Sequence, residues 1–125
     1  MTREQFEDIA QEAFDSLPPQ FRNKIENVSI VVEDYPSTQL QRSLKTGRNS
    51  LLGLYHGVPL GHRGTWYGAS PTIPDTIFLF QKNIEAQCEG DETIRRKIAE
   101  VLFHELGHYF GMNEKEVRSM LKNFT

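Results

Sequence analysis

The spacing of hydrophobic residues predicts a helix at the start of the chain. Between Thr2 and Leu17, apolar side chains recur every three or four residues, which places them on one face of a helix. Thr2 followed by Gln5 is typical of a capping box at the start of such a helix. The consecutive residues Pro18 and Pro19 should end it, because proline lacks the backbone N–H that a helix interior uses. We expect this helix to serve packing alone.

Three short segments rich in β-branched and aromatic residues predict strands over residues 28–33, 51–56 and 76–81. Residues 37–50 are polar, and we expect them to be irregular except for one helical turn. Residues 57–75 contain four glycines and three prolines between the second and third strands. A connection of this length is commonly functional in a compact domain.

A longer helix is predicted from Asp91 to about Phe110, followed by a short helix over 113–121. Asp91 is the expected cap of the long helix, and Gly111 is its expected stop because glycine tolerates a positive φ. The order helix, three strands, helices is typical of an α+β fold. We expect a small mixed sheet packed against the N-terminal helix and the long helix, with residues 1–125 forming one domain.

Composition excludes several functional classes. The chain is 38% hydrophobic and 25% charged with a formal net charge of −3, so it lacks the basic face that nucleic-acid binding requires. Its single cysteine, Cys88, cannot form an intrachain disulfide and fits a reducing compartment. The acidic, amphipathic start is not a signal peptide, and no apolar run approaches the roughly 18 residues of a membrane span. We expect a cytoplasmic monomer with no nucleic-acid or membrane partner.

The long predicted helix contains the motif HELGH, in which His104 and His108 stand four residues apart. Residues at this spacing lie on one helix face, so both imidazoles can reach a single ion. Zn²⁺ accepts imidazole nitrogen and, in catalytic sites, keeps three protein ligands together with a water. Glu105 lies beside that space without being a ligand. There it can act as a general base and take the proton of the attacking water.

The place of the motif on its helix supports this interpretation. Four apolar residues define one helix face: Ile94, Ile98, Val101 and Leu102. Glu105 falls near the middle of that face, His108 lies on it and His104 lies at its edge. A carboxylate on a buried face is unfavourable unless a partner satisfies it. A metal ion and its water are suitable partners.

A third ligand is expected shortly after the helix. Gly111 lets the chain turn back, so that a side chain three residues later can face the metal from outside the helix. That residue is Glu114, which would complete a set of two histidines and one glutamate. Glu116 is a competing source of this ligand.

The stretch HELGHYFGMNE resembles the metzincin-type pattern HExxHxxGxx followed by histidine or aspartate. It most resembles the bacterial family of minimal zincin-like metallopeptidases. Residues 51–64 and 74–85 and the acidic and basic lead-in to the motif helix are similar to that family as well. The resemblance implies a compact zincin-like fold and zinc-dependent hydrolysis of peptide bonds. The chain departs from the family at Glu114, where aspartate is more common.

The resemblance also bears on substrate binding. In zincins an edge strand aligns an extended peptide, and the strand over 76–81 leads toward the metal helix. His62, Arg63 and Tyr67, in the glycine-rich segment 57–75, are candidates for contacting substrate or polarising its carbonyl group. His56 borders the same segment.

We expect narrow specificity, with the segment 57–75 acting as a lid that a suitable substrate or partner orders. Two alternatives remain open from the sequence. One is a zinc hydrolase of a non-peptide amide. The other is a non-catalytic interaction domain that zinc stabilises.

Overall fold

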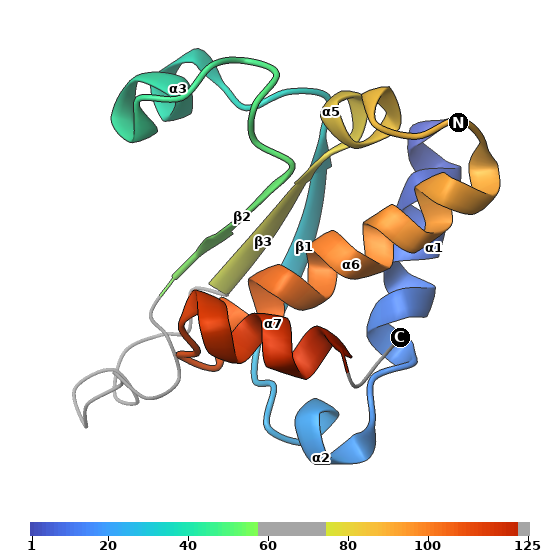
Figure 1. Cartoon of the computed structure of the whole chain (residues 1–125), viewed down its shortest axis with the longest axis vertical. Coiled ribbons are helices and arrows are strands. Elements are labelled where there is room, and N and C mark those ends of the chain that lie inside the picture. Colours follow the sequence, from blue (N-terminus) through green and yellow to red (C-terminus); the bar gives the residue numbers. More distant parts are fainter. Residues whose placement is uncertain (58–74, 123–125) are drawn as a thin grey trace.

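The computed structural model describes residues 1–57 and 75–122, in which helices pack on a three-stranded sheet (Figure 1). The strands are β1 (Val28–Glu33), β2 (Gly53–His56) and β3 (Asp75–Phe80). Their order is β1-β3-β2, with β1 parallel and β2 antiparallel to β3. The sheet is therefore mixed, as predicted.

The strand predicted over 76–81 is the central strand of this sheet and not an edge strand. Its partner residues run from Val28↔Asp75 on β1 to Gly53↔Leu79 on β2. The apolar run of β3 is consistent with this position, because Ile77 and Leu79 are fully buried. The edge strand that packs against the metal-motif helix is β2.

The sheet is accompanied by α1 (Arg3–Asp15), α2 (Pro19–Arg22), α3 (Thr38–Leu44), α5 (Gln81–Ala86), α6 (Asp91–Tyr109) and α7 (Glu114–Lys122). The predicted capping box begins α1, since the Gln5 N–H donates to Thr2 Oγ1 at 3.1 Å and the Thr2 N–H donates to Gln5 Oε1 at 3.0 Å. The helical turn expected within 37–50 is α3. The prediction missed α2, in which Pro19 occupies the first turn, where its missing N–H is harmless.

Residue Gln81 was predicted to end a strand, but it begins α5 instead. Both Gln81 and Asn83 are buried, and their side chains bind the backbone of distant segments. The Asn83 amide donates to the carbonyl oxygens of Arg48 at 2.8 Å and Leu51 at 2.9 Å. These hydrogen bonds satisfy polar groups inside the fold, and no local sequence pattern predicts them.

The hydrophobic core lies between the sheet and the pair α1 and α6, which pack against each other (Figure 1). The core residues with no exposed surface are Phe6, Ile77, Leu79, Ile84, Ile98 and Leu102. The cap of α6 is Gly90 and not Asp91, because the Gly90 N–H donates to Thr93 Oγ1 at 3.1 Å. Within the described ranges, no helix has both the length and the apolar character needed to cross a membrane.

Candidate metal centre

The chain reverses direction at the end of α6 through a Schellman turn. The N–H of Gly111 donates to the carbonyl of His108 at 2.9 Å, and the N–H of Met112 donates to that of Gly107 at 3.0 Å. Gly111 has a φ of +79°, which glycine adopts without strain. Gly111 therefore ends the helix as predicted, and the following residues return along α6.

At the start of α7, the side chains of the two candidate glutamates have different partners. Asn113 and Glu116 form a capping box, in which the Glu116 N–H donates to Asn113 Oδ1 at 2.8 Å and the Asn113 N–H donates to Glu116 Oε1 at 3.2 Å. The Glu116 side chain is thus engaged at the helix terminus. Glu114, in the first turn of α7, reaches the two histidines.

Three side-chain atoms converge at this place. His104 Nε2 and His108 Nε2 lie 3.3 Å apart. Glu114 Oε1 lies 3.4 Å from the first and 3.1 Å from the second. Zinc bonds of 2.0–2.1 Å imply separations of roughly 3.3–3.4 Å between the ligand atoms of a tetrahedral site. Two of the three separations match this range and the third is about 0.2 Å shorter, so the three atoms lie close to three corners of a zinc tetrahedron.

Glu105 is the buried member of the cluster, with 9% of its surface exposed. Its ligand atom and those of His104 and His108 lie within 4.8 Å of one another, a group that could hold a metal ion. The Tyr55 backbone N–H donates to Glu105 Oε1 at 2.9 Å. Burial raises the pKa of the Glu105 carboxyl above its ordinary value, while charge on the histidines and the Tyr55 hydrogen bond lower it.

Tyr55 is a functional contact that sequence reasoning missed. Its backbone N–H holds Glu105, and its hydroxyl donates to Asp75 Oδ2 at 2.7 Å. Its ring also packs edge-on against Tyr109, with centroids 6.0 Å apart. A backbone donor has no signature in a sequence, because every residue except proline carries one. Only the pairing of β2 with β3 reveals which N–H faces α6.

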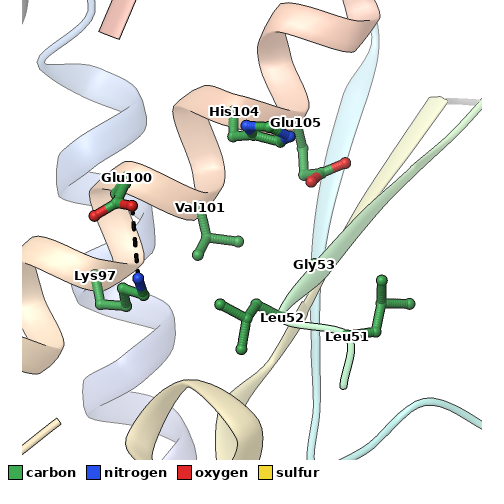
Figure 2. Close-up of a pocket in the computed structure, with 8 residues that line it drawn as sticks. All are labelled: Leu51, Leu52, Gly53, Lys97, Glu100, Val101, His104 and Glu105. Atoms are coloured by element: carbon green, nitrogen blue, oxygen red, sulfur yellow. Dashed lines mark ion pairs between the residues drawn. The ribbon is translucent and has the colours of Figure 1, made fainter. Parts of the chain in front are cut away.

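A cavity of about 240 Å³ opens beside His104 and Glu105, between α6 and β2. Figure 2 shows its lining residues, which are Leu51, Leu52, Gly53, Lys97, Glu100, Val101, His104 and Glu105. The lining is largely apolar, and Lys97 and Glu100 form an ion pair of 3.5 Å at one side. The cavity therefore offers an apolar binding place next to the candidate metal position.

The other sequence-predicted site residues are placed as follows. His56 is exposed at the end of β2. The candidates His62, Arg63 and Tyr67, and most of the predicted lid, fall within 58–74 and lie outside the described residues.

Comparison with protein families identifies the family to which the chain belongs. The sequence model of a family described as zincin-like metallopeptidase matches residues 25–122. This range contains all three strands and the whole of α6 and α7. No curated protein matches the chain.

Proposed function

Because the chain belongs to the zincin-like metallopeptidase family, we propose that it is a zinc-dependent peptidase whose metal is held by His104, His108 and Glu114. One observation carries the proposal. The ligand atoms of these residues are 3.1–3.4 Å apart, close to the spacing of a tetrahedral zinc site. Three protein ligands leave the fourth position open, which is typical of catalytic zinc and not of structural zinc.

Zinc bound here supplies a Lewis acid that makes water nucleophilic near neutral pH. Glu105 is the proposed general base. The Tyr55 N–H fixes one of its oxygens, which leaves the other to receive a proton. In the metal-free protein, burial raises the pKa of this carboxyl, which makes it a stronger base than an exposed carboxylate.

The backbone of β2 is suited to align an extended peptide. The Phe80 N–H donates to the Leu52 carbonyl at 2.9 Å, so Leu52 points toward β3. Backbone groups alternate along a strand, and those of Gly53 therefore point away from β3, as does the Tyr55 N–H that donates to Glu105. An extended substrate pairing on this side would lie along the cavity of Figure 2. We propose that the cavity selects an apolar side chain and gives the enzyme narrow specificity.

The first test is metal content. Purified protein should contain about one zinc per chain by elemental analysis. His108→Ala should lose this zinc and all peptide hydrolysis. The matched control is His56→Ala, because His56 is an exposed histidine at the end of β2. Full zinc content in His108→Ala would place the metal elsewhere and refute the proposed ligands.

The alternatives give different results in the same experiment. A non-catalytic zinc domain would bind zinc through His108 but cleave no member of a peptide library. A hydrolase of another amide would leave peptides intact and turn over small amide substrates, with the same loss in His108→Ala.

A further inference from the structure

Gly107 is a glycine in the interior of α6 and is buried. Glycine is unfavourable inside a helix, so its presence here calls for a reason at the level of packing. A Cβ at residue 107 would lie 2.5 Å from Val117 Cγ2 and 3.2 Å from Val117 Cγ1. The first distance is far below a van der Waals contact. The missing side chain at residue 107 is therefore what allows α7 to approach α6 this closely.

Val117 shares a helix face with Glu114. It is fully buried, and it follows Glu114 by three residues, about one turn of α7. On α6, Gly107 lies between His104 and His108. The distance between Val117 and Gly107 consequently sets the distance of Glu114 from the two histidines.

The Glu114 side chain depends on this backbone placement. It is 56% exposed, so little packing of its own restrains it. The Schellman turn fixes the reversal of the chain after α6, and the Asn113–Glu116 capping box fixes the start of α7. Neither of these two contacts sets the distance between α6 and α7. That distance is set by the contact between Gly107 and Val117.

We propose that Gly107 and Val117 are positioning residues that hold Glu114 at ligand distance from His104 and His108. This inference rests on the proposed metal site. The spacing between α6 and α7, and not the three ligands alone, determines zinc affinity. A methyl group added at residue 107 should move α7 outward and carry Glu114 away from the histidines.

The test measures the zinc affinity of the full chain by competition with a chromophoric chelator. Gly107→Ala should bind zinc about 10–100-fold more weakly, the range seen when groups supporting a metal ligand are changed. The double variant Gly107→Ala with Val117→Ala adds a methyl group on α6 and removes side-chain volume from the facing residue on α7. It should restore zinc affinity to within a few-fold of wild type. Gly90→Ala is the matched control, because a Cβ there meets nothing within 4 Å.

A thermodynamic cycle tests whether the effect acts through Glu114. In a Glu114→Ala background, Gly107→Ala should weaken zinc binding no further, because the ligand that it displaces is already absent. The absorption spectrum of the Co²⁺-loaded protein gives a second readout. Gly107→Ala should share the altered spectrum of Glu114→Ala, and the double variant should regain that of wild type.

Unchanged affinity in Gly107→Ala, or an equal further loss in the Glu114→Ala background, overturns the inference while the ligand set stands. If Glu114→Ala itself keeps wild-type affinity, the proposed third ligand and the inference both fail. Where Gly107→Ala does not fold, as judged by far-ultraviolet circular dichroism, Val117→Ala alone carries the test. It loosens the same contact, and its loss of affinity should likewise vanish in the Glu114→Ala background.

Discussion

At the scale of single residues, opposing influences act on the pKa of the Glu105 carboxyl. Burial favours its protonated form, whereas charge on His104 and His108 and the N–H of Tyr55 favour the carboxylate. The Tyr55 hydrogen bond also fixes the orientation of the carboxyl group. In the metal-free protein, burial outweighs these influences and leaves the pKa of the carboxyl raised.

Replacing Glu105 by Gln separates proton transfer from metal binding. Gln keeps the shape of the side chain and an oxygen that can accept from Tyr55 N–H, but it cannot take up a proton. We expect zinc content to stay at the wild-type level and kcat on a cleaved peptide to fall by about 10²–10⁴-fold. A Glu105→Gln enzyme as active as wild type would exclude this residue as the base.

The raised pKa of Glu105 also predicts how the stability of the metal-free protein depends on pH. A folded-state pKa above the ordinary 4.5 means that the folded state binds more protons between the two values. The contribution of Glu105 to folding therefore becomes less favourable as pH rises through that window. Chemical unfolding with a metal chelator present should show Glu105→Gln more stable than wild type at pH 8. The difference should shrink toward pH 4, and a difference independent of pH would contradict the prediction.

At the scale of elements, the connection between α6 and α7 brings the candidate ligands together. Gly111 has a φ of +79°, and a Cβ there would meet nothing within 4 Å. The requirement for glycine at this position is therefore conformational and not steric. At Gly107 the reverse holds, because the backbone is helical and a neighbouring side chain occupies the space.

Gly111→Ala should accordingly lower the free energy of unfolding by about 1–2 kcal/mol, the cost of the left-handed conformation for a residue with a Cβ. Gly111→Asn should lose less, since asparagine tolerates this conformation. Denaturant titration of the metal-free proteins measures both. If Gly111→Ala matched wild type, the end of α6 would not depend on this glycine.

Most of the local elements, and the packing of a small mixed sheet against α1 and α6, were predictable from the sequence, but the strand order and the contacts between distant segments were not. The periodicity of α6 placed Glu105 on the buried face, and the spacing of Gly111 and Glu114 anticipated the return of the chain. These features depend on neighbours a few residues away. The central position of β3, the buried amide of Asn83 and the role of the Tyr55 N–H depend on segments far apart in the sequence. Hydrophobic periodicity carries no information about such partners.

At the scale of the whole molecule, the candidate metal position lies among several packed elements. It lies where α7 returns onto α6 and where α6 packs on β2 (Figure 1). A ligand that binds the folded state alone stabilises it by mass action. Zinc should therefore raise the free energy of unfolding of the protein.

Thermal unfolding measures this coupling. With free zinc at 100 times its dissociation constant, the gain in unfolding free energy should be up to about 2.7 kcal/mol relative to chelator-treated protein. His108→Ala should unfold at the same temperature with and without zinc. A wild-type protein equally indifferent to zinc would argue against a site within the folded core.

The order in which the chain folds follows from where these partners lie along it. The proposed ligands fall between residues 104 and 114, so α6 and α7 alone can bring them together. The placement of the Tyr55 N–H depends on the pairing of β2 with β3. Strand β3 in turn pairs with β1 from Val28↔Asp75 onward, and this pairing requires closure of a long loop. We expect a partly folded chain to capture zinc before Glu105, the proposed general base, acquires the Tyr55 N–H as its partner. Loading with metal would then be an early event, and competence for hydrolysis would come last, when the sheet closes.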